Sequence, residues 1–412
     1  MKKILFVIVA LLYAATAQCQ TIHWLTFIDT NDEHVGEMDK NGQALLFSRF
    51  RNVVNAALST AGYKADNQEF FGNRLTPQNC KDAITSLKCD ENDIIVFYYI
   101  GHGTHAAAEN NPFPQMMMGV SWDKERYFIP LQWAHDQLKS KGARLCVTIG
   151  MCCNPIQGAS AKSVLRFSSN DFSHNYGNTY ITDYQIENIL HLFLESKGDI
   201  IQATAKVGEL SWGFYHEDMN GWIDSWTRNL ILEFDDMMKT GKDTDWNDFL
   251  GNTGKRTAAE HDKIRIESRS NPKGVDAECD KLGCLHTQTP FNQINVTKAP
   301  RPKFIPTPEP DKTAESAEEA LEYYLSYLVK RDTKVSDRIA AKKKFLTWFA
   351  SDAEVKILGQ DGNTVIDKES PSKFAGRIST SRILLNVALD DCALDAHGKI
   401  TTLWVKEYYK KN

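Results

Sequence analysis

Two short apolar runs, each ending in glycine, most strongly constrain what this chain can fold into. Residues 94–100 (IIVFYYI) lead into a glycine that precedes His102, and residues 145–149 (LCVTI) lead into a glycine three positions before Cys153. Continuous apolar runs of this length are typical of parallel strands that are buried on both faces of a sheet. Because reactive groups collect beyond the carboxyl ends of such strands, the two runs predict a site that contains His102 and Cys153.

Strands and helices are expected to alternate around these runs. Apolar residues at helical spacing and short apolar stretches predict helices over 131–141, 183–197 and 222–238 and further strands over 22–28 and 199–205. Thr76, followed by a proline, predicts the start of another helix that runs to about residue 87. This order favours an α/β domain with a mostly parallel sheet flanked by helices.

Five prolines between residues 300 and 310 divide the chain. Such a density of proline is typical of a semi-rigid linker, which we place at residues 299–312, after an α/β domain at residues 18–298. A capping box at residues 316–319 begins a helix in the remaining segment, residues 313–412. A second helix holds Phe345 and Phe349, and three strand-like runs follow, so we expect a small α+β domain.

The N-terminus has the pattern of a signal peptide at residues 1–17. Two lysines precede an apolar run from residue 4 to residue 13, and small residues at 15–17 follow it. The run is too short to span a bilayer, and no later segment has a transmembrane pattern. We therefore expect cleavage after Ala17 and export to the periplasm or the exterior. Cys19 would suit a lipoprotein, but the residues before it match a lipobox poorly, and we rank that alternative second.

The net charge limits the partners of the chain, and the number of cysteines limits its disulfide bonds. The formal net charge is −5, which gives no support for the basic face that nucleic-acid binding needs. Export permits disulfides, and the nine cysteines leave at least one thiol free because their number is odd. Local pairs are plausible between Cys279 and Cys284 and between Cys80 and Cys89. Buried thiols throughout remain the alternative.

A histidine and a thiol at neighbouring strand ends are what a cysteine nucleophile with a general base requires. Glycines beside His102 let the backbone approach a substrate closely, and the N–H of Gly103 could donate to a developing oxyanion. A nearby imidazole would lower the pKa of Cys153 and supply thiolate. Cys152 remains an alternative nucleophile, although the alternation of a strand directs the two thiols to opposite sides.

These residues carry a resemblance to a family. Residues 98–105 (YYIGHGTH) resemble the Tyr-Tyr-Ser-Gly-His-Gly-Thr block of caspase-like peptidases, especially metacaspases, and residues 152–154 (CCN) resemble their nucleophile block. Residues 286–290 (HTQTP) resemble a segment near the end of that domain. The resemblance covers about residues 22–298. It implies that His102 and Cys153 form a catalytic dyad and that the N–H groups of Gly103 and Cys153 bind the oxyanion.

The chain departs from the metacaspase pattern in the substrate pocket. Metacaspases carry an Asp two residues before the nucleophile, where this chain has Met151, which cannot pair with a guanidinium. Asp32, after the first strand, is the candidate for a second acidic pocket residue, and an ordinary turn aspartate is the alternative. Trp212, which follows a strand end, is the best of the tryptophans for a substrate groove, with core packing as the alternative.

The sequence therefore predicts an exported caspase-like cysteine endopeptidase that acts on protein or peptide substrates, with cleavage after basic residues as a further expectation. The alternative is a catalytically inactive caspase-like module that binds a peptide or partner. We expect no cofactor and no metal site, because neither His102 with His105 nor Cys279, Cys284 and His286 make a convincing ligand set. Calcium, which some metacaspases bind, cannot be placed in this sequence. The C-terminal domain resembles a nuclear-transport-factor-2-like fold in its element order, and we expect it to bind a partner or to dimerise.

Overall fold

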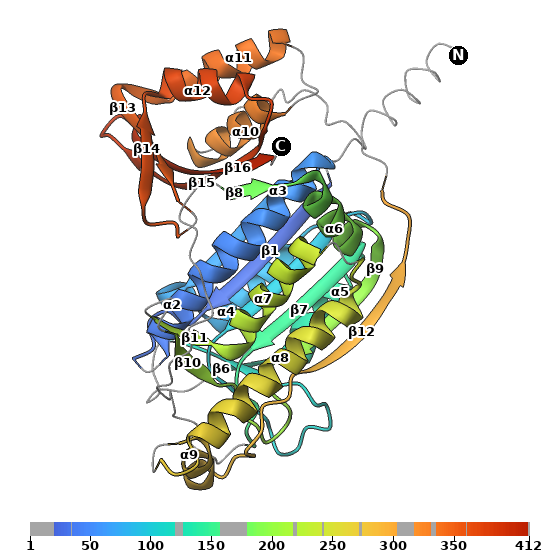
Figure 1. Ribbon diagram of the computed structural model, residues 1–412. Helices are drawn as coiled ribbons and strands as arrows, with labels where there is room; N and C mark the ends of the chain where they lie inside the picture. The colour runs from blue at the N-terminus through green and yellow to red at the C-terminus, as the bar shows by residue number, and fades with distance from the viewer. Residues whose placement is uncertain are drawn as a thin grey trace, which may run out of the picture.

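The computed structural model describes residues 20–33, 35–119, 127–156, 179–216, 221–240, 243–271, 274–302, 317–330, 335–359 and 361–410. The signal peptide and most of the linker that the sequence predicts lie outside the described residues. The described part is mixed α/β, with a mostly parallel sheet flanked by helices and a separate, smaller sheet domain (Figure 1). Within the described residues, no helix combines the length and the apolar character needed to cross a membrane.

The large sheet has six strands in the order β12-β9-β7-β3-β1-β2. All neighbours are parallel except the edge pair β12 and β9, which is antiparallel. Every residue of β3 and β7 is buried, as their continuous apolar sequences require. The strands are β1 (Thr21–Ile28), β2 (Lys64–Phe71), β3 (Ile94–Ile100), β7 (Leu145–Met151), β9 (Ser196–Ala203) and β12 (Phe291–Lys298).

Helices cover both faces of this sheet, and each face has its own hydrophobic core. One face is covered by α2 (Gly36–Leu45), a π-helical turn η1 (Leu46–Arg51), α3 (Asn52–Thr60), α6 (Asp183–Leu194), α7 (Ser225–Thr240) and α8 (Trp246–Glu267). The other is covered by α4 (Pro77–Ser86), α5 (Leu131–Lys139) and the small sheet of β4 (Gly103–Thr104), β5 (Gln115–Met118) and β6 (Tyr127–Pro130). Smaller elements are η2 (Gly72–Arg74), the hairpin β10 (Gly213–His216) and β11 (Gly221–Asp224), and α9 (Val275–Leu282).

Most predicted elements of the first domain are present, and two helix boundaries differ by three residues. Strands lie at the stretches predicted for β1, β3, β7 and β9, and Thr76 caps α4 by accepting the N–H of Asn79 at 3.1 Å. The helix predicted from residue 222 begins only at Ser225, because residues 221–224 form a strand. The helix predicted over 183–197 ends at Leu194, because the chain from Ser196 onward pairs as β9.

The C-terminal domain forms a curved sheet with helices on one side. Its elements are α10 (Ala317–Val329), α11 (Val335–Leu346), β13 (Phe349–Leu358), β14 (Val365–Glu369), α12 (Pro371–Thr380), β15 (Leu384–Leu394) and β16 (Ile400–Lys410). Phe349, predicted to be helical, is the first residue of β13. The first domain contributes β8 (Thr179–Ile181), which pairs with β16 and so joins the two domains.

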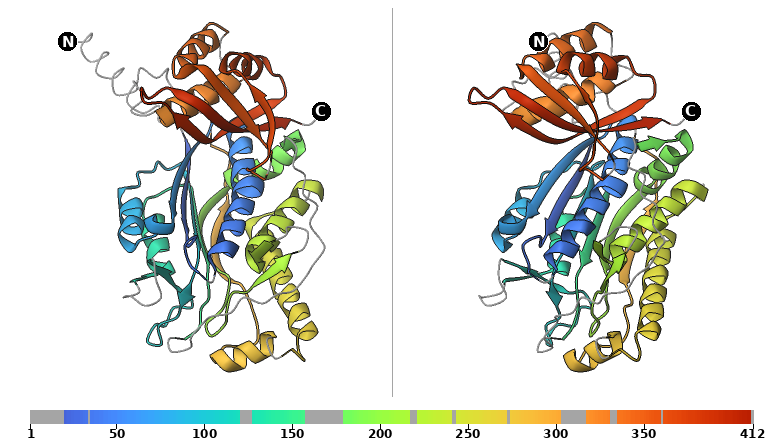
Figure 2. Two further views of the ribbon diagram at one scale, coloured as in Figure 1. Left: turned by 90° about the vertical axis from the view of Figure 1, so that its left-hand side faces the viewer. Right: turned by 60° about the vertical axis from the view of Figure 1, so that its left-hand side comes forward.

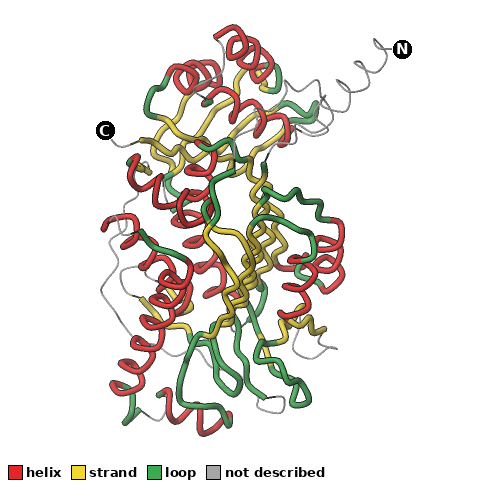
Figure 3. The backbone as a smooth tube through the Cα atoms, turned by 90° about the vertical axis from the view of Figure 1, so that its right-hand side faces the viewer, coloured by secondary structure: helices red, strands yellow, loops and turns green. Residues whose placement is uncertain are grey.

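The two ends of the large sheet have different surroundings. The C-terminal domain lies over the amino ends of the parallel strands (Figure 2). Loops gather at the opposite end, beyond the carboxyl ends of the strands (Figure 3). The carboxyl end of the sheet therefore lies away from the second domain.

Candidate functional site

The order of the strands places a site where β1 and β3 meet. The strand β1 has β2 as its neighbour on one side within the sheet and β3 on the other. The chain passes from β1 to β2 and then returns across β1 to β3. The crevice beyond the carboxyl ends of strands at such a reversal is where α/β sheets bind ligands. The segments that leave β1, β3 and β7 at this point carry Asp32, His102 and Cys153.

The pairing of β3 with β7 brings His102 and Cys153 to the same edge. The parallel register ends with Ile100 opposite Met151, and the N–H of Gly101 donates to the carbonyl of Met151 at 3.2 Å. Two residues further along both chains, His102 lies level with Cys153. Ile100 and Met151 share the hydrophobic core of one face, whereas Cys152 belongs to the core of the other face. The strand alternation therefore separates the two thiols, and Cys152 is 1% exposed.

Gly103 lets the two segments touch. A Cβ atom at this position would lie 2.4 Å from the carbonyl oxygen of Cys153 and 2.6 Å from the sulfur of Cys152. The contact with Cys153 cannot be relieved by moving a flexible side-chain end, because the carbonyl oxygen belongs to the backbone. Just beyond, the N–H of His105 donates to the carbonyl of Pro155 at 2.7 Å. Glycine at position 103 is thus needed for the close approach that holds the histidine segment against the cysteine segment.

Asp32 faces the imidazole of His102. Its Oδ2 lies 3.3 Å from Nε2 of His102, and the side chains are 7% and 11% exposed. The other carboxylate oxygen accepts the N–H of Val35 at 3.0 Å, which fixes the orientation of the carboxylate. The backbone carbonyl of His102 accepts from the hydroxyl of Tyr99 and from the N–H of Met117. The backbone of His102 is therefore anchored, and its ring lies against the carboxylate of Asp32.

The Cys153 thiol is covered by the segment that follows β9. The N–H of Ser211 donates to Sγ of Cys153 at 3.3 Å, and the thiol contacts the carbonyl of Ser211 at 3.6 Å. Burial raises the pKa of Cys153 to about 11, although the Ser211 hydrogen bond opposes the shift and the charge of Asp39 adds to it. The thiol is therefore neutral at pH 7 in this structure.

The segment 286–290 (HTQTP) holds that covering segment in place. The N–H of Trp212 donates to the side chain of Gln288 at 3.1 Å, and Gln288 donates to the hydroxyl of Ser211 at 3.2 Å. The buried carboxylate of Glu209 accepts the hydroxyl of Thr287 at 2.6 Å and the N–H of Thr289 at 2.6 Å. A motif that the sequence singled out thus positions the backbone that touches the thiol.

Three buried aspartates and the partly buried Asp32 form an acidic cluster near the dyad, and sequence reasoning found only Asp32. The cluster consists of Asp29 and Asp32 after β1, Asp39 on α2, and Asp224 at the end of β11. Burial, followed by the charge of Asp32, raises the pKa of Asp29 to about 7. Burial raises the pKa of Asp224 to about 6 and holds that of Asp39 well above its usual range. Among the described residues, neither oxygen of Asp39 has a hydrogen-bond partner.

The remaining predicted residues lie close to the thiol but inside the core. Met151 is 2% exposed, with its sulfur 3.6 Å from the hydroxyl of Ser211. Trp212 is 1% exposed and packs in a cluster that contacts Cys153, so it forms core behind the thiol rather than the wall of a groove. His105 contacts the side-chain oxygen of Asn154 at 3.2 Å.

The two candidate cysteine pairs differ in the structure. Cys279 and Cys284 form a disulfide. Cys80 and Cys89 are free thiols. The disulfide ties the end of α9 to the turn that follows it, directly before the segment 286–290.

Comparisons with known proteins add little to this geometry. No protein-family model matches the chain, and no curated protein matches it. Among solved structures, the chain is similar to protein GSU0716 from Geobacter sulfurreducens, with 12% sequence identity and a TM-score of 0.32. That match covers 69% of this chain and 96% of the other, and at such a TM-score it supports no conclusion about fold or function.

Proposed function

We propose that the chain is an exported cysteine endopeptidase with a caspase-like domain, in which Cys153 is the nucleophile and His102 the general base. The observation that carries the proposal is the β3–β7 register, which sets His102 level with Cys153 at the carboxyl edge of the sheet. Asp32 next to the imidazole is the group that would orient His102 and stabilise the imidazolium.

The chemistry proceeds in two steps. His102 takes the thiol proton as Cys153 Sγ attacks the peptide carbonyl carbon, so that a C–S bond forms and the peptide C–N bond breaks. The proton passes to the leaving amine. His102 then removes a proton from water, which attacks the thioester, and the products are a carboxylic acid and the restored thiol. The N–H groups of Gly103 and Cys153 are the proposed oxyanion donors.

Buried charge supports a basic side chain as the group that precedes the cleaved bond. Burying a carboxylate without a cation is costly, so Asp29, Asp39 and Asp224 either keep their protons or receive a positive group. A lysine or arginine side chain of the substrate would supply that group, preferably a guanidinium with its bidentate geometry. In this proposal Asp29, Asp39 and Asp224 bind the basic side chain. They take the role of the aspartate that metacaspases carry at the position of Met151.

The raised pKa of Cys153 favours the second candidate, a caspase-like module that binds a basic peptide and does not cleave it. A thiol that is neutral at pH 7 and covered by Ser211 is a poor nucleophile unless the histidine accepts its proton. In both candidates, the C-terminal domain is proposed to be of the nuclear-transport-factor-2-like type and to serve as a partner-binding or dimerisation surface.

A cleavage profile on a peptide library separates the two candidates. The mature chain is expected to cut after Arg and Lys, and Cys153→Ala is expected to lower kcat/KM by about 10³-fold or more. Cys152→Ala is the matched control, because it removes the neighbouring thiol that points into the opposite core, and its activity should stay within about tenfold of the parent. Iodoacetamide should label one hyperreactive thiol, which Cys153→Ala removes. A chain that binds Arg peptides without cleaving them or reacting with iodoacetamide would establish the binder.

A further inference from the structure

A second cluster of reactive side chains lies at the opposite end of the large sheet. His23 is the third residue of β1, Asp93 directly precedes β3, and Cys89 lies in the loop between α4 and β3. Within β1, five residues, roughly 17 Å at ~3.3 Å per residue, separate His23 from the end of the strand where the candidate active site begins. The cluster therefore has no part in the proposed peptidase chemistry, and it lies at the end of the sheet that faces the C-terminal domain (Figure 2).

We propose that His23, Cys89 and Asp93 bind a zinc ion. One ligand atom from each residue, a ring nitrogen, a thiol sulfur and a carboxylate oxygen, lies within 4.8 Å of the other two. Ligands of a tetrahedral zinc ion, bound at about 2.0 to 2.3 Å, lie roughly 3.3 to 3.8 Å apart. Nε2 of His23 and Oδ2 of Asp93 already have this spacing, at 3.5 Å. The remaining separations between the three ligand atoms are at most 4.8 Å, so a movement of about 1 Å would bring them to the spacing of zinc ligands.

The partners of His23 and Asp93 orient both residues for a metal. Oδ2 of Asp66 lies 2.8 Å from Nδ1 of His23, so Nδ1 donates its proton there and Nε2 is left to face the cluster. A carboxylate behind a histidine is the usual support of a metal-bound imidazole. The carboxylate of Asp93 is fixed by the N–H groups of Thr21 and Asp90, each at 2.7 Å.

The ligand types select zinc among the common cations. Calcium and magnesium take oxygen ligands, whereas zinc accepts imidazole, thiolate and carboxylate together. Cys89 is partly exposed, so the ion has a path from solvent, and water completes the four ligands. Without a metal, the same contacts describe an imidazolium between two carboxylates: burial opposes the charge of His23, but the hydrogen bonds to Asp66 and Asp93 outweigh it and raise its pKa to about 11.

Zinc titration of the mature chain tests the proposal. The protein carries Cys153→Ala so that the candidate active site offers no thiol, and it is handled under inert gas without a reductant, which keeps the Cys279–Cys284 disulfide closed, and stripped with EDTA before titration against a chromophoric chelator. One equivalent of Zn²⁺ per chain is expected. Cys89→Ser and His23→Gln should each weaken binding at least tenfold, and Asp66→Asn, which removes the orienting carboxylate, by about tenfold. Cys392→Ser, a partly exposed thiol in the C-terminal domain, is the matched control and should bind as the parent does.

Cobalt substitution gives a readout that does not depend on the variants folding. Co²⁺ bound to the parent should show a thiolate-to-metal charge-transfer band in the near ultraviolet, together with the strong visible bands of a tetrahedral site. A chain that takes up no zinc, a Cys89→Ser variant that binds as tightly as the parent, or a cobalt spectrum without the thiolate band would each overturn the proposal, and the first of these would leave His23 as the ion-paired imidazolium. Each of these results leaves the proposed peptidase function untouched.

Discussion

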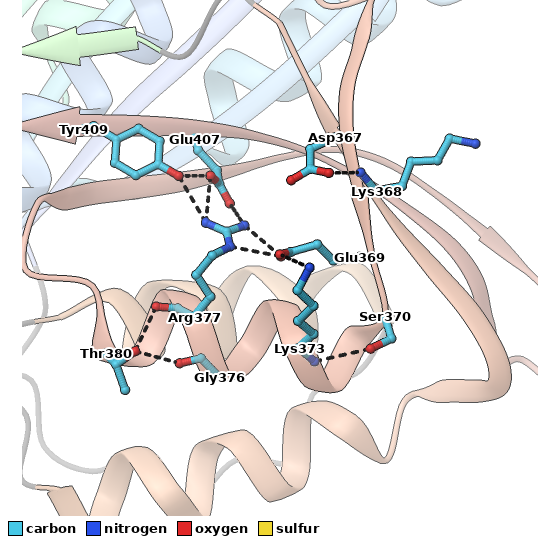
Figure 4. A network of polar contacts seen from close by, with 10 residues as sticks. All are labelled: Asp367, Lys368, Glu369, Ser370, Lys373, Gly376, Arg377, Thr380, Glu407 and Tyr409. Atoms are coloured by element: carbon cyan, nitrogen blue, oxygen red, sulfur yellow. Dashed lines mark hydrogen bonds and ion pairs between the residues drawn. The ribbon is translucent and has the colours of Figure 1, made fainter.

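Two clusters of buried carboxylates, one in the C-terminal domain and one at the candidate active site, differ in whether a cation of the chain lies against them. In the C-terminal domain, Glu369 and Glu407 are 6% and 3% exposed, and both bind Arg377 (Figure 4). The guanidinium donates to the two oxygens of Glu407 at 3.0 and 2.6 Å and through Nε to Glu369 at 3.0 Å. Lys373 lies 3.4 Å from the other oxygen of Glu369. Each carboxylate there has a cation in direct contact.

The acidic cluster at the candidate active site has the opposite character. Burial raises the pKa of Asp39, and every charged neighbour that adds to the shift is itself an aspartate: Asp29, Asp224 or Asp32. The C-terminal network shows that this chain can place an arginine where a buried carboxylate needs one. Under the proposed function, the basic side chain of a substrate would supply the cation that the cluster near Cys153 lacks.

Removing Arg377 should have the largest effect on stability. Arg377→Met leaves Glu369 and Glu407 buried without their main cation, and breaking a buried pair in this way costs about 3 kcal/mol. We expect about 2 kcal/mol, because the Arg377 side chain is 32% exposed and solvent screens part of the charge. Urea unfolding measures the loss, and hydrogen exchange over residues 400–410 localises it to β16.

Lys373→Met is the matched control for that variant. Lys373 contacts the same Glu369, but its side chain is 70% exposed, so its removal should change the free energy of unfolding by less than about 0.5 kcal/mol. If the two variants were equally stable, Arg377 would not compensate the buried charge, and the contrast between the domains would lose its basis.

Removing Asp39 should have the reverse effect on stability and a separate effect on activity. Asp39→Asn takes away a buried charge that no cation offsets, so the free energy of unfolding at pH 8 should rise by about 1 kcal/mol. The same change weakens the proposed pocket, and kcat/KM for an Arg peptide should fall at least tenfold, or about 1.4 kcal/mol. A stabilised and less active variant is the signature of a residue kept for function.

Two controls make the Asp39 result specific. Glu37→Gln alters an exposed acid on the same helix and should leave both quantities unchanged within about 0.5 kcal/mol. Assays in EDTA and in added calcium identify the cation, because a calcium site would make the stability of the parent, but not of Asp39→Asn, depend on the metal. An Asp39→Asn variant that is less stable than the parent at pH 8 would contradict the account of the cluster.

The sequence was sufficient to predict the two strand ends but not the cluster of aspartates beside them. His102 and Cys153 stood out because each follows a continuous apolar run, and such runs have few structures open to them. Asp39 and Asp224 have no such context. Asp39 lies on the buried face of α2 next to Met38, where an acid breaks the apolar pattern, and that break is the only signal that could have identified it.

Buried polar residues also explain why the sequence did not predict helix α8. The 22-residue helix α8 begins with Trp246, Phe249 and Leu250 at helical spacing, but its buried face continues through Thr253, Thr257 and His261. The apolar period therefore disappears after one turn, and a search for apolar periodicity stops there. The start of α7 was placed three residues too early, because Trp222 and Ile223 of β11 extend the helical pattern of Trp226 and Leu230 backwards by chance.

The pH dependence of stability should distinguish a carboxylate without a cation from one that has a cation, with an effect no larger than that of Asp39→Asn. Burial raises the pKa of Asp29 to about 7, above the value of about 3.9 in the unfolded chain, so the folded state binds a proton more tightly. The stability this provides is complete below pH 4 and is lost as the pH rises through 7. Asp29→Asn should therefore match the parent at pH 4 and be about 1 kcal/mol more stable at pH 8.

Asp199 is the opposite case: burial would raise its pKa, but hydrogen bonds from Lys139, Asn295 and His135 lower it below the unfolded value. Its stabilisation is present above pH 4 and is lost as the pH falls through the lowered pKa, so Asp199→Asn should be less stable than the parent at pH 7, with the gap closing in acid. Urea unfolding of both variants from pH 3 to 8 measures the two difference curves, and curves with the same sign would show that the two sites treat negative charge alike.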